Sequence, residues 1–397
     1  MKWPVLPLST ALASAEVFTD GDWVESKDQD PHGDVRLVQL ADVGDGGYID
    51  KSARFLTSTK ARELRCTFLK PGDVMVARMP DPLGRACIFP GDPKPSVTVV
   101  DVCVIRPDSR AHDPRWLMHC LNASTCRNQI AGFATGTTRS RISRGNLGKI
   151  TIPIPPLSEQ RRIAEVLDRA DALRAKRRAA LAQLDTLTQA IFLDMFGDRP
   201  PGSNGLKQVC LSDVTTRITD GTHLTPQFVE AGVPFIFVKN VRNGVIDFRT
   251  DKFISEEQFK VLYGRCPIEE GDVLYTTVGT YGEAASVGTF TKFAFQRHVA
   301  HLKPDVGKVV PSFLGTLMQL PIVKYQADRW ARGVAQPTIN LKELREFVVP
   351  MPRIGQQRDF TRRVAAVEKL KATQRASLAE LNTLFASLQH RAFRGEL

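Results

Sequence analysis

The chemically informative residues of this chain gather in residues 135–144, a short segment rich in threonine, serine and arginine. Arginine can donate two parallel hydrogen bonds to guanine, asparagine and glutamine can pair in the same way with adenine, and hydroxyl groups can hold phosphates. A small, flexible segment with these side chains suits a loop that faces DNA. Its candidate contacts are Thr137, Thr138, Arg139, Arg141 and Arg144.

A second segment, residues 332–338, lies about 197 residues further along the chain and aligns with the first. At that offset Gln336 takes the place of Arg139, and Thr338 is a further candidate contact. Because glutamine suits adenine and arginine suits guanine, the exchange predicts that the two segments contact different bases.

Further candidates flank the ends of predicted strands. They are Arg78, Arg85, Lys239, Asn240, Tyr281, Gln296 and Arg297. For each of these taken singly, an ordinary solvated side chain explains the residue as well as a DNA contact does. His223 and His301 are expected to be structural.

The sequence lacks the patterns that would indicate catalysis. It has no Asn/Asp-Pro-Pro-Tyr/Phe motif of base methylation and no glycine-rich turn for S-adenosylmethionine or a dinucleotide, and residues 145–150 lack the spacing of a P-loop. Its cysteines form no Cys-x-x-Cys pair, and Cys120 and Cys126 are expected to pack on a helix. We therefore predict no catalytic residue and no metal ligand.

Composition adds a preference for a partner and a compartment. Lysine and arginine exceed aspartate and glutamate by 11 in 397 residues, which favours a polyanionic partner, although a merely basic solvated surface gives the same excess. An apolar stretch near the N-terminus resembles an export signal, but residues 6–9 have a mid-chain counterpart in residues 209–212. An odd number of cysteines and the lack of a run of about 18 apolar residues favour a cytoplasmic protein.

A duplication organises the elements that position these residues. Matches continue along the chain at the offset of about 197 residues, with small insertions in the earlier part of each copy. They include Val102 and Val299, Pro107 and Pro304, Gln129 and Gln326, Gly136 and Gly333, Leu147 and Leu344, and the Gly-Asp-Val runs 72–74 and 271–273. A period this long indicates a duplicated domain. The copies keep their apolar frame but differ in polar residues, which predicts two related but distinct ligands.

Each copy is predicted to be a mixed α and β domain followed by a long helix, so the fold class is α+β. Predicted strands lie at residues 35–40, 73–77, 97–105, 234–238, 272–275 and 299–302, and predicted helices at 114–130 and 311–327. Proline-rich hinges at 153–156 and 350–353 end the globular parts. The predicted divisions are a first domain 1–152, a hinge and helix 153–197, a second domain 198–349, and a hinge and helix 350–397.

The long helices carry the strongest periodicity, because their seam residues alternate by three and four as in a coiled coil. The predicted seams are Ile163, Val166, Ala170, Leu173, Arg177, Ala180, Leu184, Leu187 and Ile191, and Phe360, Val364, Val367, Leu370, Gln374, Ser377, Leu381, Leu384 and Leu388. Arg177 and Gln374 are polar at the same level, so we hypothesise that they fix the alignment. The helices are expected to pack antiparallel as a rigid spacer of roughly 54 Å. The alternative is a pair of separate surface helices.

Together these features resemble the specificity subunits of type I restriction-modification enzymes. The resemblance covers essentially the whole chain. It rests on the repeated Pro-x-Pro-x-Leu/Ile-x-x-Gln-Arg hinge, the Gly-Asp-Val turns, and Gln-Arg-His-Val at 296–299 before a strand. The hinge motif ends in Gln160 and Arg161 in the first copy and in Gln357 and Arg358 in the second. The first copy departs from the Gln-Arg-His pattern, with Val-Val-Asp at 99–101.

The resemblance implies a non-catalytic subunit with two target recognition domains, each reading one half of a bipartite site in double-stranded DNA. It implies that the helices set the unread spacer and dock methyltransferase subunits, two of them, and that restriction subunits can join the complex. Helix residues expected to serve these roles are Gln160, Arg161, Leu173, Arg177, Leu184, Gln357, Arg358, Leu370, Gln374 and Leu381. No cofactor is expected in this chain, whereas S-adenosylmethionine, ATP and Mg²⁺ are expected on the partner subunits. No membrane partner is expected.

Two other interpretations share the basic charge and the helices. One is a coiled-coil scaffold for proteins, and the other is an adaptor that binds nucleic acid without sequence preference. Salt separates a DNA reader from a protein scaffold, because binding through many phosphates weakens steeply as the salt concentration rises.

Overall fold

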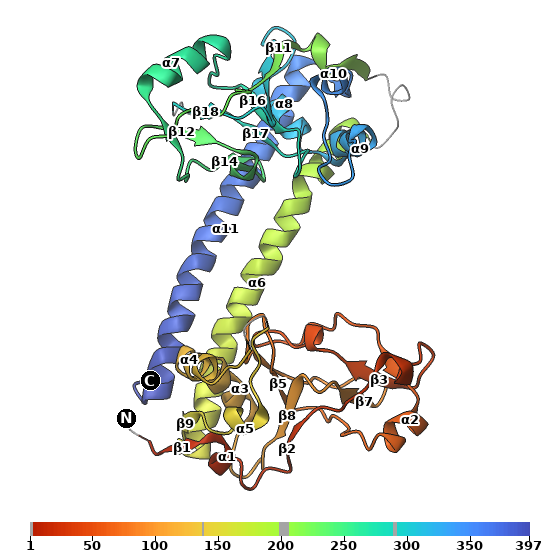
Figure 1. The fold of residues 1–397 in the computed structure, drawn as a ribbon, viewed down its shortest axis with the longest axis vertical. Helices are drawn as coiled ribbons and strands as arrows, with labels where there is room; N and C mark the ends of the chain where they lie inside the picture. The colour runs from red at the N-terminus through yellow and green to blue at the C-terminus, as the bar shows by residue number, and fades with distance from the viewer. Residues whose placement is uncertain (1–2, 137–138, 198–205, 289–291) are drawn as a thin grey trace. The chain divides into compact units, whose positions relative to one another are not determined.

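The computed structural model describes residues 3–136, 139–197, 206–288 and 292–397 (Figure 1). The chain forms two compact units. Unit 1 comprises Met1–Ala179 with Arg375–Leu397, and unit 2 comprises Ala180–Gln374. Each unit therefore contains one globular copy together with part of each long helix. This division runs through the helices, whereas the sequence-based boundaries separate helices from globular parts.

Unit 1 begins with a short strand that returns to pair with the last strand of its globular part. Its strands are β1 Val5–Pro7, β2 Val17–Asp20, β3 Val35–Val38, β4 Phe55–Leu56, β5 Val74–Ala77, β6 Ala86–Ile88, β7 Ser96–Thr98, β8 Val102–Arg106 and β9 Thr151–Pro153. Its helices and 3₁₀ turns are α1 Leu8–Ala11, η1 Ser26–Asp28, η2 Leu40–Asp42, α2 Ser58–Glu63, α3 Pro114–Asn122, α4 Ser124–Gly132, α5 Arg144–Leu147 and the start of α6 Leu157–Phe196.

Unit 2 repeats most of this order and adds one short antiparallel strand pair within residues 241–246. Its strands are β10 Lys207–Cys210, β11 Thr215–Asp220, β12 Val233–Ile236, β13 Val241–Arg242, β14 Val245–Ile246, β15 Phe253–Ile254, β16 Val273–Thr276, β17 Ala284–Ser286, β18 Ala294–Phe295, β19 Val299–Pro304 and β20 Val348–Met351. Its helices and 3₁₀ turns are η3 Leu211–Asp213, η4 Val238–Asn240, α7 Glu256–Arg265, α8 Pro311–Leu317, α9 Pro321–Trp330, α10 Leu341–Arg345 and the start of α11 Ile354–Arg394.

The sheets show the duplication most directly. Unit 1 has an antiparallel sheet in the order β2-β8-β5-β6 and a three-stranded sheet in the order β4-β3-β7 (Figure 1). Unit 2 has the same pair of sheets, in the orders β11-β19-β16-β17 and β15-β12-β18. The terminal strands also correspond, because β1 pairs with β9 and β10 pairs with β20. The predicted mixed α and β architecture is therefore confirmed.

Three predicted elements are wrong because each is two elements. The predicted strand 97–105 is divided into β7 and β8 by a turn at residues 99–101, where the chain leaves one sheet for the other. The predicted helix 114–130 breaks at Ala123, whose backbone is extended. The predicted helix 311–327 breaks at Leu320, where the following Pro321 disfavours a helical conformation.

One buried glutamine joins each globular part to its long helix. Gln160 is 1% exposed; its carbonyl accepts from the Asp113 N–H at 2.9 Å and its amide donates to the Pro155 carbonyl at 3.0 Å. Gln357 is fully buried; it accepts from the Val310 N–H at 2.8 Å and donates to the Pro352 carbonyl at 2.8 Å. The glutamine of the repeated hinge motif thus forms hydrogen bonds that attach the start of the long helix to its domain. We call Gln160 and Gln357 the hinge locks.

The long helices pack antiparallel within each unit. In unit 1, Arg174 of α6 donates to Asn382 of α11 at 2.8 Å, and its guanidinium lies 4.2 Å from the centre of the Phe385 ring. In unit 2, Lys371 of α11 pairs with Asp185 of α6 at 3.3 Å, and Phe360 packs edge-on against Phe192. The predicted antiparallel coiled coil is confirmed.

The predicted seam register is wrong at four leucines. Leu173, Leu187, Leu370 and Leu384 are 51%, 38%, 46% and 50% exposed. The partly or fully buried positions are instead the next residues, Arg174, Thr188, Lys371 and Phe385. On α6, the fully buried Leu167, four residues after Ile163, belongs to the unit 1 core, so the interval of four comes first on that helix. Alternation by three and four alone does not reveal which interval comes first.

Both units use the end of one long helix to complete their cores. Ala392 and Phe393 of α11 join the core of unit 1, and Phe192 and Phe196 of α6 join the core of unit 2. Among the described residues, no helix has both the length and the apolar character needed to span a bilayer.

Candidate nucleic-acid interface

Four segments of each globular copy meet at one edge, which we call the four-segment edge. In unit 1 it consists of residues 20–24, 78, 99–101, 135–136 and 139–142, and in unit 2 of residues 220–224, 277–280, 296–298 and 332–339. The same backbone hydrogen bonds hold both edges. Thr277 N–H donates to the His298 carbonyl at 3.0 Å, and Ile339 N–H to the Thr277 carbonyl at 2.9 Å. In unit 1, Arg78 N–H donates to the Asp101 carbonyl at 2.9 Å, and Ile142 N–H to the Arg78 carbonyl at 3.0 Å.

Glycine is required where the first segment crosses the turn between the two sheets. A Cβ on Gly21 would collide with the Val99 carbonyl, and one on Gly221 would collide with the Phe295 carbonyl. The Thr-Asp-Gly run that occurs in both copies therefore reflects a close backbone crossing. That crossing fixes where the next residues emerge.

The edge of unit 2 brings together five of the residues predicted from sequence. Three adjoining grooves of about 260, 330 and 310 Å³ share His298 in their walls. Lys239, Gln296, Arg297, Gln336 and Thr338 line these grooves. Donors and acceptors suited to adenine, guanine and phosphate thus lie on one surface.

His298 lies at the centre of this surface, and the sequence did not single it out as a contact. Partial burial, the charge of Arg297 and the nearby His223 lower its pKa below the ordinary histidine value. Its Nε2 accepts from the Arg297 Nε at 3.3 Å, as expected for a neutral ring. His223 is exposed and pairs with Asp220 at 2.9 Å.

In the edge of unit 1, ion pairs join the four segments at positions that align with the groove residues of unit 2. Arg78 is 5% exposed, pairs with Asp20 at 2.6 Å, and donates to the carbonyls of Ile142 and Val100 at 2.9 and 3.0 Å. Arg141 pairs with Asp101 at 3.2 Å, and both side chains are partly exposed. Asp101 stands where unit 2 has His298.

Three of the predicted contacts, Arg78, Arg85 and Asn240, are buried, and we leave them out of the interface. Besides Arg78, Arg85 is 7% exposed and donates to the carbonyls of Val43 and Leu40, at 2.5 and 2.8 Å. Burial lowers the pKa of Arg85. Asn240 is 4% exposed and caps η4, as Asp42 caps η2 in unit 1. Sequence spacing placed these side chains at strand ends but could not show that they point inward.

The remaining predicted contacts differ in their surroundings. Arg139 is exposed. Arg144, also exposed, donates to the Phe18 carbonyl at 3.0 Å. Tyr281 donates to Asp328 at 2.9 Å and stacks under Lys324, outside the three grooves. Thr137 and Thr138 lie outside the described residues.

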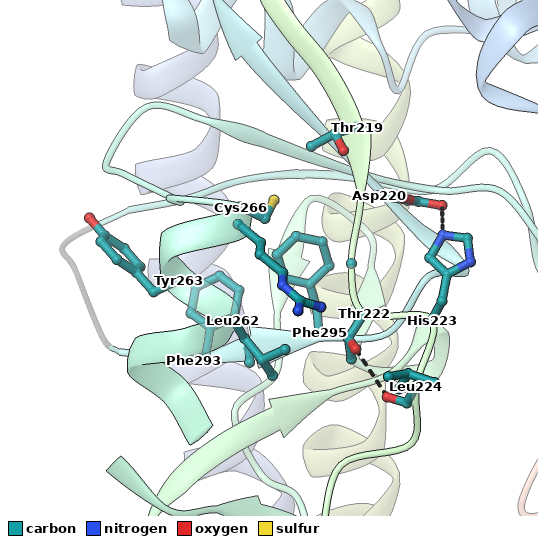
Figure 2. A pocket seen from close by; sticks show the side chains of 13 residues that line it. Thr219, Asp220, Thr222, His223, Leu224, Leu262, Tyr263, Cys266, Phe293 and Phe295 are labelled. Atoms are coloured by element: carbon teal, nitrogen blue, oxygen red, sulfur yellow. Dashed lines mark hydrogen bonds and ion pairs between the residues drawn. The ribbon is translucent and has the colours of Figure 1, made fainter. Parts of the chain in front are cut away.

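Behind the first segment of unit 2 lies a more apolar cavity of about 200 Å³ (Figure 2). Leu262 and Tyr263 of α7 line it together with Phe293 and Phe295. Cys266 also lines the cavity, and its thiol lies 3.2 Å from Nδ1 of the fully buried His301. His301 in turn bonds Asp272 at 2.7 Å, which confirms its structural role. Burial raises the pKa of Cys266 to about 11, so this thiol stays protonated.

The hinge and helix residues divide into buried and exposed groups. Gln160 and Gln357 are the buried locks described above, whereas Arg161 and Arg358 are exposed. Arg177, Leu184, Gln374 and Leu381 are half-buried seam residues. Leu173 and Leu370 are exposed, which corrects their assignment to the seam.

Comparison with known proteins places these features in a family context. Residues 36–183 match the family described as the type I restriction modification DNA specificity domain. The chain is 27% identical to the Escherichia coli type I restriction enzyme EcoBI specificity subunit, over 77% of this chain and 70% of that protein. It is 24% identical to the EcoKI specificity subunit of E. coli K12, over 74% of this chain and 68% of that protein.

Solved structures share the fold. One, described as the structural basis of complex assembly and conformational transition of the type I R-M system, has a TM-score of 0.59 at 20% identity and covers 100% of this chain and 98% of its own. A type I restriction-modification S subunit from M. genitalium has a TM-score of 0.55 at 14% identity, covering 99% of this chain and 96% of its own. The resemblance inferred from the hinge motifs is confirmed.

Proposed function

We propose that this chain, a homologue of type I specificity subunits, is the DNA-recognition subunit of a type I restriction-modification complex. Each globular copy reads one half of a bipartite target through its four-segment edge. The observation that carries the proposal is that two edges with the same backbone bonds present different side chains: Asp101 and Arg141 in unit 1, and His298 and Thr338 in unit 2. One frame with two chemistries suits two different half-sites.

Charge supports DNA as the ligand. The chain carries a net charge of +11, Arg139 and Arg297 are exposed on the two edges, and Lys239 is exposed in a groove beside the edge of unit 2. Side chains that can hold phosphates therefore lie beside side chains that can read base edges. A scaffold that binds only proteins would need no such arrangement.

The exposed leucines of the long helices are the proposed docking points for the methyltransferase subunits. At the level where Arg174 meets Asn382, unit 1 presents Leu173 and Leu384. Each is one residue before a seam residue. In an antiparallel pair of right-handed helices, the positions one residue before the seam face the same side. Unit 2 presents Leu187 and Leu370 by the same geometry. Two apolar pairs in duplicated positions suit two copies of one partner.

Catalysis and its cofactors are assigned to the partners. Target methylation needs S-adenosylmethionine and cleavage needs ATP and Mg²⁺, and we place these groups on the methyltransferase and restriction subunits. The part played by this chain is to position the DNA for them.

The proposal is tested by co-expressing the chain with the methyltransferase subunit encoded beside it and mapping every methylated base on a sequenced plasmid. We expect a split motif of two short defined halves around a fixed undefined gap. Methylation without a split motif, or none from a folded complex, would favour the scaffold. The leucine docking points are tested by pull-down of the methyltransferase with Leu173→Glu and Leu384→Glu, which should lower its capture in contrast to Val306→Glu.

The same assay tests the spacer role of the helices. Lengthening α6 and α11 together by one turn, about 5.4 Å, should lengthen the undefined gap by one or two base pairs of about 3.4 Å each. An unchanged gap would contradict the idea that the helices measure it.

A further inference from the structure

The first segment of each four-segment edge presents a large apolar side chain to solvent, and the proposed function uses neither of the two. In unit 1, Trp23 is 67% exposed, and in unit 2, Leu224 is 75% exposed. Trp23 follows Gly21 by two positions and Leu224 follows Gly221 by three, so both emerge from the same segment just after the glycine crossing. A single exposed leucine on a protein surface needs no explanation. A large exposed apolar side chain that recurs in the equivalent loop of two diverged copies does need one.

The loops hold these side chains out firmly. In unit 2, the Thr222 hydroxyl donates to the Leu224 carbonyl at 3.0 Å, and His223 bonds Asp220, as Figure 2 shows. In unit 1, Asp22 N–H donates to the Thr98 carbonyl at 2.8 Å, and the Trp23 indole donates to Glu25 at 3.1 Å. These bonds order the two loops before a ligand arrives, which lowers the entropic cost of the contact.

The surroundings indicate what covers them. Leu224 shares a groove with Gln296, Arg297 and His298, the hydrogen-bonding surface of unit 2. The loop of Trp23 carries three carboxylates, Asp22, Glu25 and Asp28, and one base, Lys27, which pairs with Glu25 at 2.8 Å. The remaining negative charge repels phosphates, so the loop fits the floor of a groove, where base edges lie, better than it fits the DNA backbone.

We propose that Trp23 and Leu224 make the apolar base contacts of their respective half-sites, resting on a thymine methyl group or entering a base step. This inference rests on the proposed function. Duplex DNA is the occupant because apolar side chains placed among base-reading groups are a recurring means of contacting thymine methyls and of unstacking base steps. Each residue acts on its own half of the target.

The test uses the full chain in complex with its methyltransferase subunits and a duplex carrying the mapped target. Leu224→Ala should weaken binding roughly 10-fold. Trp23→Ala should weaken it by about 10-fold or more, and Trp23→Phe should restore much of the loss. The matched control is Val306→Ala, because Val306 is 76% exposed but follows β19 at the end remote from the edge. It should bind as the wild type does.

Two readouts separate this role from loss of structure. The slope of log affinity against log salt should stay unchanged in Leu224→Ala, whereas Arg297→Ala should reduce it by about 1. Replacing thymine by uracil in the second half-site should cost nothing further in Leu224→Ala if the contact is to the methyl group. If Leu224 enters a base step, 2-aminopurine beside it should lose fluorescence in that variant instead.

The outcomes are distinguishable from failure of the proposed function. If the wild-type complex binds no bipartite duplex in preference to random DNA, the proposed function fails. If the wild type is specific and both Trp23→Ala and Leu224→Ala bind like Val306→Ala, the apolar contacts are refuted and the proposed function stands.

Discussion

The two recognition edges share a backbone but differ in how their charges are arranged. In unit 1, Arg78 and Arg141 are paired with Asp20 and Asp101, so much of the edge is neutralised internally. In unit 2, the positions of Arg78 and Asp101 hold Thr277 and His298. The difference teaches that the frame does not depend on those ion pairs, since backbone bonds and a glycine crossing hold both edges. Side chains on a fixed frame are free to specify the ligand.

The sharpest way to break this comparison is to remove the buried charge of unit 1. Arg78→Ala should cost unit 1 about 3 kcal/mol of unfolding free energy, because it leaves Asp20 and two carbonyls without their donor. Thr277→Ala at the aligned position should cost unit 2 about 1 kcal/mol, since it removes one neutral hydrogen bond. Hydrogen exchange of peptides from each unit measures the two losses separately. Equal losses would contradict the assigned difference between the edges.

The shared frame should show equal sensitivity at its hinge locks. Gln160→Ala and Gln357→Ala should each lower the unfolding free energy of their unit by about 2 kcal/mol, because each leaves a buried N–H and buried carbonyls unpaired. The measurement is the same exchange experiment with urea. The exposed neighbours Arg161→Ala and Arg358→Ala serve as controls and should change little. A large loss in only one unit would show that the hinges are not equivalent.

Exchanging one aligned side chain should alter base choice without altering the frame. Gln336→Arg and Arg139→Gln should each change discrimination at one position of one half-site by roughly 10-fold, since a good bidentate contact is worth about 1–3 kcal/mol. Sequencing of methylated targets from cells expressing each variant gives the result. A change in the other half-site would break the assignment of one edge to one half.

The smallest expected effect is a difference in pH response. The pKa of His298 lies below its unfolded value of about 6.5, so the unfolded state binds more protons in the interval between them. The contribution of His298 to the stability of unit 2 should therefore be fully present above about pH 6.5 and be lost as the pH falls through the folded pKa. Exchange protection of unit 2 at a series of pH values measures the decline, and His298→Gln should flatten it. Unit 1, with Asp101 at this position, is the internal reference.

The sequence predicted the frame well because the frame is made of apolar periodicity and turns. The duplication, the paired sheets and the two long helices all follow from spacing that any side-chain packing would have to satisfy. What the sequence could not predict were breaks set by single backbone conformations, as at Ala123, and the seam register of α6, where Leu167 enters the globular core.

The site was predicted in part for a physical reason of the same kind. Lys239, Gln296, Arg297, Gln336 and Thr338 come together because they lie in loops that the sheets must bring to one edge. Arg78, Arg85 and Asn240 also lie at strand ends, but their long or polar side chains satisfy backbone carbonyls inside the domain. Residue type does not distinguish a polar group that stabilises a turn from one that awaits a ligand.

Because the end of α11 completes the core of unit 1, the order of synthesis affects when each unit can finish folding. Phe393 lies in the core of unit 1, yet it follows Ala179 by more than two hundred positions, and all of unit 2 lies between. At a synthesis rate of about 5–20 residues per second, the first globular copy waits on the order of 10–40 s for its last helix. Unit 2, which is continuous from Ala180 to Gln374, can complete its packing during that interval. The copy that leaves the ribosome first is therefore the one that finishes folding last.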